Sequence, residues 1–211
     1  MGRIEYLCSL IDPCASFADV GCDHGYCSLH VLRAGKCKDV IISDVSAKCL
    51  QKAEKLLSDF IVRGWCRAVR CDGLREIPEN TEQILVAGMG GEEIIKILSE
   101  AFLPRKFIFQ PMKNAEKLRA YLIERGCKIT LDDIFKDGKF YFVIKGERGG
   151  GTAPYSETEL QLGRDALKNP LIKDYAREEL LKKERYLTQC GESYQREKIL
   201  EQIKILTEIM Q

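Results

Sequence analysis

Residues 18–32, ADVGCDHGYCSLHVL, join a short apolar run to an amphipathic segment through a turn that contains Gly21 and Gly25. A strand, a glycine turn and a helix in this order are typical of the first unit of a nucleotide-binding α/β sheet. The dinucleotide fingerprint G-x-G-x-x-G is not met, because Asp23 and Tyr26 stand where the second and third glycines belong. A carboxylate repels a pyrophosphate but attracts the sulfonium and amino groups of S-adenosylmethionine. The turn therefore favours that cationic cofactor over NAD or FAD.

Apolar runs rich in β-branched residues alternate with helix-like segments from residue 17 to about residue 147. Alternation on this scale predicts βα units around a mostly parallel sheet, an α/β fold. The last two runs are separated by KDGK, whose Asp137-Gly138 is a strong hairpin signal, so we expect the sheet to end in an antiparallel strand pair. The predicted strands are FADVG, VIISDV, AVRCD, QILVAGM, KFIFQP, CKITLDDIF and KFYFVIKG.

The segment ERGGGTAPYS interrupts these patterns with three consecutive glycines and a proline. Such a composition is typical of a linker and divides the chain into a domain of residues 1–150 and a helical domain of residues 151–211. In the second domain Leu180 and Leu187 are one heptad apart, and Gly191 breaks the helical pattern. We expect a helix pair folded back on itself or two helices of a coiled coil, which either stabilises the first domain or binds a partner.

The composition is that of a globular protein. Hydrophobic residues make up 45% of the chain, and no apolar run approaches the roughly 20 residues of a membrane span. The N-terminal segment lacks the features of a secretory signal, which favours the cytoplasm. The ten cysteines include no C-x-x-C pair, so we expect no metal site and mostly buried thiols. Because the net charge is only +1, a polyanion would have to bind a local basic surface.

Two aspartates end the second and third predicted strands, Asp44 in VIISD and Asp72 in AVRCD. Open α/β sheets bind ligands at the carboxyl ends of their strands, where a carboxylate accepts hydrogen bonds from ribose hydroxyls. We predict Asp44 at the ribose and Asp72 near the adenine of the cofactor. A single aspartate at a strand end is often only a helix N-cap, so the ordered set with Asp23 carries the argument. The predicted cofactor contacts are Gly21, Cys22, Asp23, Gly25, Asp44, Val45, Cys71, Asp72, Gly73, Ala87, Gly88, Met89 and Gly90.

The fourth predicted strand ends in VAGMGGEE, residues 86–93. Its glycines allow a bound group to approach the backbone closely, and the alternative is a flexible turn before a helix. Enzymes that methylate exocyclic amino groups commonly carry an Asn/Asp-Pro-Pro-aromatic tetrad at this place. GMGG offers no such side-chain acceptor, which favours a ring nitrogen as the methyl acceptor.

Taken in order, the motifs resemble a known family, the bacterial tRNA adenine-N1 methyltransferases that modify adenine 22 in the D-loop. The resemblance rests on ADVGCDHGY, SDVS, RCDGL, ILVAGMGGEEIIKIL, FIFQP, LRAYLIERGCKI and VIKGERG, and it runs from about Arg3 to Gly149. It implies a Rossmann-like class I methyltransferase sheet with a C-terminal coiled-coil-like domain, S-adenosylmethionine as cofactor and tRNA as partner. The chain departs from the family at Cys22 and at Cys27-Ser28, where members carry a small polar residue and Leu-Pro.

Within this resemblance, Asp23, His24, Tyr26 and Gln110 are the candidates for catalytic contacts. His24 is expected to orient the turn or to touch the target base, and the alternative is a purely structural role. Tyr26 either stacks on an adenine drawn out of the tRNA or is buried against the next helix. Gln110 and Pro111, at the end of the fifth predicted strand, are expected to contact the base or close the pocket.

A basic stretch that we expect beside the site is the candidate surface for tRNA phosphates, represented by Arg105, Lys106 and Lys113. The alternative is that these residues are ordinary solvated charges. Residues 3–10 are expected to form a short helix that covers the sheet or the site. We expect a monomer or weak dimer. Two other hypotheses stay open: an inactive protein of this fold that binds RNA as a scaffold, and a methyltransferase for a different acceptor.

Overall fold

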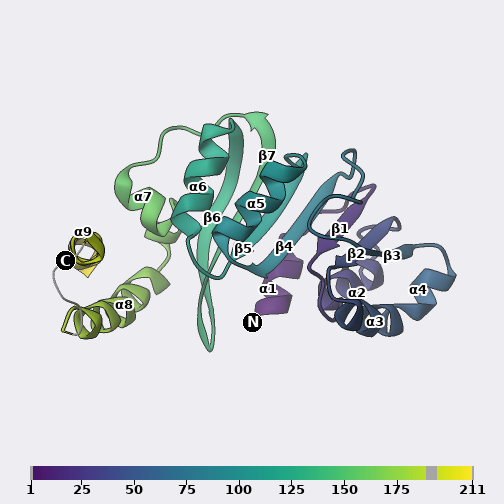
Figure 1. Ribbon diagram of the computed structural model, residues 1–211, viewed down its shortest axis with the longest axis horizontal. Helices are drawn as coiled ribbons and strands as arrows, with labels where there is room; N and C mark the ends of the chain where they lie inside the picture. The colour runs from purple at the N-terminus through teal and green to yellow at the C-terminus, as the bar shows by residue number, and fades with distance from the viewer. Residues whose placement is uncertain (1, 189–193, 211) are drawn as a thin grey trace.

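A computed structural model describes residues 2–188 and 194–210 and places a single seven-stranded sheet between two layers of helices (Figure 1). The strand order is β3-β2-β1-β4-β5-β7-β6. Strands β1 to β5 are parallel, and β7 runs antiparallel to both of its neighbours. The strands are β1 Phe17–Val20, β2 Val40–Asp44, β3 Cys66–Arg70, β4 Gln83–Met89, β5 Lys106–Pro111, β6 Cys127–Asp137 and β7 Lys139–Gly150.

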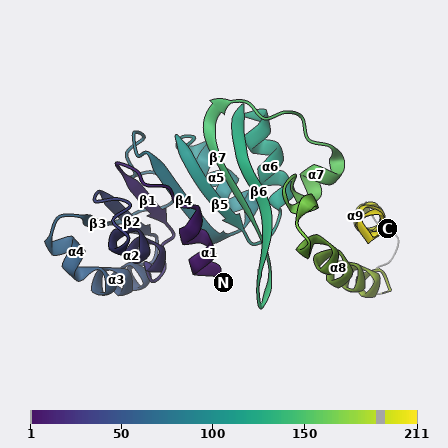
Figure 2. The same cartoon turned by 180° about the vertical axis from the view of Figure 1, so that it is seen from behind.

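Helices cover both faces of the sheet, as Figures 1 and 2 show from opposite sides. The helices of the first layer are α1 Arg3–Leu10, α2 Tyr26–Arg33, α3 Ala47–Leu56 and α4 Ser58–Val62; those of the second are α5 Gly91–Glu100 and α6 Ala115–Glu124. Side chains along β2 alternate between the two cores, since Val40 and Ile42 join the first and Ile41 joins the second. Burial on both faces explains why this strand reads as a continuous apolar run.

The predicted hairpin is confirmed. β6 and β7 are joined by Gly138 alone, at φ 69°, and the hairpin extends beyond the end of the sheet (Figure 1). The prediction that the whole of ERGGGTAPYS interrupts the pattern is wrong, because β7 continues to Gly150. Glu147 pairs with Lys106 of β5, and Gly150 pairs with Cys127 of β6.

The C-terminal region is helical, as predicted. It contains α7 Glu157–Leu162, a 3₁₀ turn Ala166–Lys168, α8 Leu171–Leu187 and α9 Tyr194–Met210. Helices α8 and α9 contact each other, and Ile172 and Ile205 share a small core with Ile134 of β6. The predicted break at Gly191 lies outside the described residues.

A buried ion pair joins this helical region to the sheet. Both carboxylate oxygens of Asp132 on β6 accept from Nε of Arg119 on α6 at 2.9 Å, and both side chains are completely buried. Nη1 of the same arginine donates to the carbonyl oxygens of Leu160 and Gln161 at the end of α7, at 3.0 Å each. One side chain thus connects three elements, so α7 has a fixed place against the methyltransferase-like sheet.

The nine described cysteines are free, and seven of them are buried, as expected of thiols that serve as small hydrophobic side chains. Within residues 2–188 and 194–210, no cluster of three or more His, Cys, Asp or Glu side chains has the geometry to hold a metal ion. None of the described helices is long and apolar enough to cross a membrane.

Candidate active site

The turn after β1 has an unusual backbone. Gly21, Asp23 and Gly25 all have positive φ, at 70°, 48° and 73°. The N–H groups of Gly21 and Cys22 donate to the carbonyl of Ser43 at the end of β2, at 2.8 and 3.0 Å. A left-handed conformation at a residue other than glycine costs about 1–3 kcal/mol and is often found at functional sites. The turn therefore holds the Asp23 backbone in a fixed, strained shape at the carboxyl edge of the sheet.

Asp44 ends β2 directly beside this turn. Its Oδ2 accepts from the N–H of Asp23 at 3.1 Å, and its Oδ1 accepts from the N–H of Ser46 at 2.8 Å. The side chain is only 9% exposed. A carboxylate has about four lone-pair positions, so each oxygen of Asp44 keeps capacity for one further donor. This arrangement suits a carboxylate that is held rigidly and accepts from a pair of ribose hydroxyls.

Asp19, on β1, is a residue of this site that the sequence analysis did not single out. It is buried and accepts from the hydroxyl of Ser28 on α2 at 2.8 Å. Burial raises its pKa to about 6, and the nearby charge of Asp44 acts in the same direction. Its place as the first acid of the D-x-G pattern is the sequence signal that points to it. Asp19 connects α2 to β1 through this hydrogen bond and is only 5% exposed.

Three polar side chains of the turn face solvent. The side chain of Asp23 is 66% exposed and lies 3.7 Å from Nε2 of His24. The rings of His24 and Tyr26 are stacked with centroids 5.6 Å apart, and Tyr26 is 52% exposed. Of the two alternatives for Tyr26, burial against the next helix is therefore not observed. Its exposed ring is free to stack on a base, and His24 supports it from one side.

The ends of β2 and β3 supply the remaining predicted cofactor residues. Val45 follows Asp44 and is exposed, which leaves an apolar side chain next to the proposed ribose position. Asp72 is exposed, and Cys71 is buried with its Sγ 3.4 Å from the carbonyl oxygen of Gly73. Gly73 has a positive φ of 62°, and a Cβ there would lie 2.9 Å from Ile97 on α5. These residues lie at one edge with the turn after β1, as predicted.

The end of β4 lies next to that turn. Gly88 is exposed with φ 85°, and Ala87 and Met89 are half-buried. The side chain of Met89 lies against Gly21, where a Cβ would overlap its Cε. Gly21 and Gly88 carry no side chain of their own, and the places that a Cβ would take there are bordered by Met89 and by Nη2 of Arg3. A methyl donor bound there would be close to main-chain atoms on both sides.

Gly90 and Gly91 start α5 and bring it against the loop after β5. The N–H of Gly91 donates to the carbonyl of Lys113 at 2.8 Å, and a Cβ at Gly91 would overlap the carbonyl of Asn114. A Cβ at Gly90 would lie 3.1 Å from the Lys113 side chain. Lys113 is therefore held at the same edge as the β4 glycines, as the sequence analysis expects.

Gln110 is the last residue but one of β5 and is completely buried. Its Oε1 accepts from Nε of Arg3 on α1 at 2.8 Å, and its Nε2 donates to the carbonyl of Pro111 at 3.0 Å and lies 3.5 Å from Sδ of Met112. Because Gln110 is buried and its amide is hydrogen-bonded inside the protein, its side chain is not presented to a bound adenine in this structure, contrary to the expected contact with the base. The predicted helix over residues 3–10 is confirmed, and it covers this part of the site.

Arg105 and Lys106 do not lie beside the site, so their predicted placement is wrong. They occupy the beginning of β5, and parallel strands present their beginnings at the opposite edge from their carboxyl ends. Nζ of Lys106 is 2.9 Å from Glu82, which precedes β4 at that opposite edge. Of the three predicted phosphate contacts, only Lys113 is found at the carboxyl edge.

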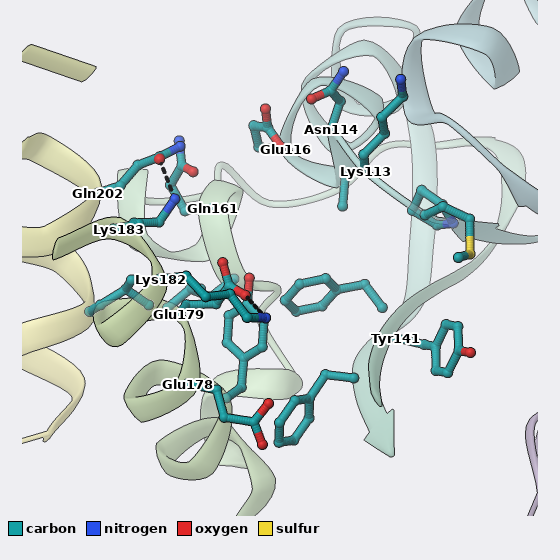
Figure 3. Close-up of a pocket in the computed structure, with 18 of the residues that line it drawn as sticks. Lys113, Asn114, Glu116, Tyr141, Gln161, Glu178, Glu179, Lys182, Lys183 and Gln202 are labelled. Atoms are coloured by element: carbon teal, nitrogen blue, oxygen red, sulfur yellow. Dashed lines mark hydrogen bonds and ion pairs between the residues drawn. The ribbon is translucent and has the colours of Figure 1, made fainter. Parts of the chain in front are cut away.

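A cavity of about 460 Å³ opens between this edge and the helical region (Figure 3). Residues 111–116 and 139–142 form one side, and α7, α8 and α9 form the other. Figure 3 shows Lys113 and Tyr141 on the first side and Lys182 and Lys183 of α8 on the second. Nζ of Lys183 donates to Oε1 of Gln202 on α9 at 2.7 Å, and burial lowers its pKa. The cavity borders Pro111 but not the turn after β1.

The edge thus has two parts. Asp23 and Asp72 follow β1 and β3, Asp44 is the last residue of β2, and glycines lie in the turn after β1 and at the end of β4. Beyond β4 the edge continues into the cavity lined by lysine and aromatic side chains. This is the Rossmann-like fold of the class I methyltransferases, as the sequence analysis expects.

Comparison with known proteins gives the family. The model of the family described as Methyltransferase domain matches residues 1–144, which is more than half of the chain. The chain therefore belongs to the methyltransferase domain family. That match contains every strand of the sheet except the end of β7.

Two curated relatives indicate the kind of substrate found among similar proteins. A Mycoplasma pneumoniae protein proposed to be a tRNA methyltransferase is 29% identical over 131 residues, which are 61% of each chain. The tRNA (adenine(22)-N(1))-methyltransferase of Bacillus subtilis is 27% identical over 167 residues, 76% of this chain and 70% of that protein. The chain spans about three fifths of the length of the Mycoplasma pneumoniae relative that it matches.

A solved structure matches the whole chain, including the helical region. A Streptococcus pneumoniae protein proposed to be a tRNA (m1A22) methyltransferase has 26% sequence identity and a TM-score of 0.88, covering 100% of this chain and 99% of that chain. The same protein in complex with S-adenosyl-L-methionine has a TM-score of 0.87 and covers 99% of this chain.

Proposed function

We propose that this protein transfers the methyl group of S-adenosylmethionine to N1 of an adenine in tRNA, at position 22 of the D-loop. The observation that carries the proposal is the ordered set of carboxylates at the carboxyl ends of β1, β2 and β3, next to a turn whose aspartate repels a pyrophosphate. The similarity to a structure with bound S-adenosyl-L-methionine over 99% of this chain supports the same cofactor. The tRNA methyltransferases among the relatives support the substrate.

The donor is expected to lie across β3, β2, β1 and β4. Asp44 accepts from the ribose hydroxyls, Asp72 and Gly73 border the adenine, and Val45 covers one face of that ring. The cationic methionine end lies over the turn at Gly21, where the field of Asp23 is favourable. Ala87 and Gly88 bring the β4 backbone to the same end, where Nη2 of Arg3 lies over Gly88. The other cofactor contacts proposed from the sequence are Cys22, Gly25, Cys71, Met89 and Gly90.

The transfer needs no general base. The lone pair of adenine N1 attacks the methyl carbon, the carbon–sulfur bond breaks, and its electron pair stays on sulfur as a neutral thioether. The positive charge passes from the sulfonium to the adenine ring, and no proton moves. Catalysis then rests on holding nitrogen, carbon and sulfur in line, and such positioning supplies up to about 7–11 kcal/mol in well-oriented reactions. The carboxylates of the edge also favour a positively charged product ring.

The acceptor adenine is expected on the β4 and β5 side of the donor. The exposed ring of Tyr26, stacked on His24, is the candidate platform for a base drawn out of the tRNA. Pro111 and Lys113 border the cavity through which the rest of the RNA strand would pass. Such an enzyme would work in the cytoplasm, where tRNA is modified. Its state as a monomer or weak dimer and its independence of metal remain predictions.

Methylation of an unmodified tRNA transcript tests the proposal. Protein, labelled S-adenosylmethionine and transcript are incubated, and the modified position is mapped by the stop that N1-methyladenine causes in reverse transcription. We expect a new stop at adenine 22 that disappears when this adenine is replaced by guanine. Labelling of another position, of protein or of a small molecule would identify a different acceptor. Binding of tRNA without any transfer would favour the inactive scaffold.

A further inference from the structure

Arg3 of α1 lies at the β4 and β5 side of the edge, where the acceptor adenine is expected. It contacts Gln110, although the two residues are more than a hundred positions apart in the sequence. Besides the bond from its Nε to Gln110, its guanidinium lies over the ring of Tyr141, with Cζ 5.5 Å from the ring centroid. A Cβ at Gly88 would lie 2.9 Å from Nη2 of Arg3. The guanidinium is therefore surrounded by the ends of β4 and β5 and the beginning of β7.

The guanidinium of Arg3 over Gly88 restricts which group of the substrate can bind there. Because Gly88 has no side chain, the guanidinium of Arg3 reaches this position at the end of β4 from α1. A guanidinium is a donor only and is always charged. It is a poor neighbour for adenine N1, because the ring becomes positive as the methyl group arrives. It is a good partner for an anionic oxygen close to the acceptor base.

Within residues 2–188 and 194–210 the charge of Arg3 has no counterion. Among the described residues, no carboxylate oxygen lies within 4.0 Å of its guanidinium, and neither Nη has a hydrogen-bond partner. The nearby Asp137 accepts from the backbone N–H of Arg3 at 2.8 Å instead. The side chain is half-buried. Two parallel donors on a held, unpaired guanidinium form the fork that binds a phosphate in bidentate fashion.

The surroundings of Arg3 hold it in place. Tyr6 of α1 stacks on Phe135 of β6 with centroids 4.2 Å apart, and Phe135 stacks in turn on Tyr141 at 5.3 Å. The hydroxyl of Tyr6 lies 3.3 Å from Oδ2 of Asp133. This aromatic stack fixes α1 against the β6–β7 hairpin, so the fork is set in position before any substrate arrives.

On the basis of the proposed function, we propose that Arg3 binds a backbone phosphate of the tRNA next to the acceptor adenine through its two Nη groups, while its Nε holds Gln110 and thereby the end of β5. Arg3 is then a substrate-binding residue, and Gln110 is a positioning residue that acts through it. Besides the tRNA phosphates, the reactants contain one other anion, the carboxylate in the methionine part of S-adenosylmethionine. The methionine end is expected between the turn after β1 and Gly88, and Arg3 lies over Gly88, so the affinity for S-adenosylhomocysteine is measured to separate this carboxylate from the phosphate.

The test compares Arg3→Gln with Arg3→Lys and with the control Arg33→Gln. Arg33 is an exposed cation in the last turn of α2, so the control removes the same charge from a distant surface. For each protein, steady-state kinetics on the tRNA transcript, the salt dependence of tRNA binding and the dissociation constant of S-adenosylhomocysteine are measured. Thermal melting establishes that the variants fold.

For Arg3→Gln we expect kcat/KM for tRNA to fall by about 10-fold to 100-fold, as for the loss of a hydrogen bond to a charged group. The slope of log binding constant against log salt should decrease by about 1, and the affinity for S-adenosylhomocysteine should stay within about twofold. Arg3→Lys should keep the slope and lower kcat, because a single ammonium nitrogen lacks the planar fork by which the guanidinium binds the phosphate through its Nη groups and Gln110 through its Nε. Arg33→Gln should match the wild type in all three measurements.

An unchanged salt slope of tRNA binding, together with a large loss of affinity for S-adenosylhomocysteine, would mean that Arg3 binds the carboxylate of the cofactor's methionine part. This result would overturn the proposal. Unchanged kinetics and an unchanged salt slope in Arg3→Gln would mean that Arg3 only holds α1 against the sheet. This result would also overturn the proposal. If the wild type binds tRNA but does not methylate it, the proposed function fails. In that case the salt slopes of wild type and Arg3→Gln still decide whether Arg3 contacts a phosphate.

Discussion

Replacement of Asp44 by alanine should remove most of the affinity for the methyl donor. Asp44 is 9% exposed, and each of its oxygens already accepts one backbone N–H, which leaves one acceptor position per oxygen for the two ribose hydroxyls. A hydrogen bond to a charged group contributes about 1.5–3 kcal/mol, so losing two costs at least about 3 kcal/mol. This corresponds to an increase of about 100-fold or more in the dissociation constant.

Isothermal titration with S-adenosylhomocysteine measures this change. The matched control is Asp39→Ala, since Asp39 is exposed and immediately precedes the same strand at its opposite end. Asp44→Asn keeps the size and one acceptor oxygen and should lose about tenfold, while thermal melting shows whether each variant is folded. A folded Asp44→Ala protein that binds within twofold of the wild type would refute the assignment of Asp44 to the ribose.

Three further predictions concern stability. Gly91→Ala should lower the free energy of unfolding by about 1–3 kcal/mol in urea titrations, because a Cβ there overlaps the Asn114 carbonyl; an unchanged midpoint would contradict this close approach. The pKa of Asp19 is raised by burial from 3.8 to about 6, so the folded state binds more protons and stability should fall as pH rises through this window. Asp19→Asn should flatten that slope, and a persistent slope would identify another group. Arg119→Met leaves Asp132 buried without its partner and should destabilise by about 3–5 kcal/mol, whereas a small loss in thermal and urea melts would show that the pair is dispensable.

The strands of this fold could be predicted because their burial leaves a simple trace in the sequence. Val40–Asp44 is buried on both faces and therefore apolar throughout, and Asp137-Gly138 fits the tight turn of a hairpin. The carboxylates that we assign to the cofactor could also be predicted, because parallel strands bring their carboxyl ends to one edge of the sheet. Local patterns and a single topological rule are enough for these features.

The errors arose where neighbours in sequence are separated in space. Lys106 and Pro111 are the first and last residues of β5, so about 16 Å of extended strand separates them, although the sequence suggests one basic cluster beside the site. Arg3 was missed for the opposite reason, since its bond to Gln110 joins residues 107 positions apart. The exposure of Tyr26 also depends on how α3 packs beside α2, which no local pattern determines.

The most direct test of the whole account is a crystal structure of the protein with S-adenosylhomocysteine. We predict that the ligand lies across the carboxyl ends of β1 to β4, with both ribose hydroxyls within hydrogen-bond distance of Asp44 and the sulfur between Gly21 and Gly88. A ligand bound elsewhere, or bound at this edge with Asp44 turned away into solvent, would contradict the claim that these carboxylates receive the methyl donor.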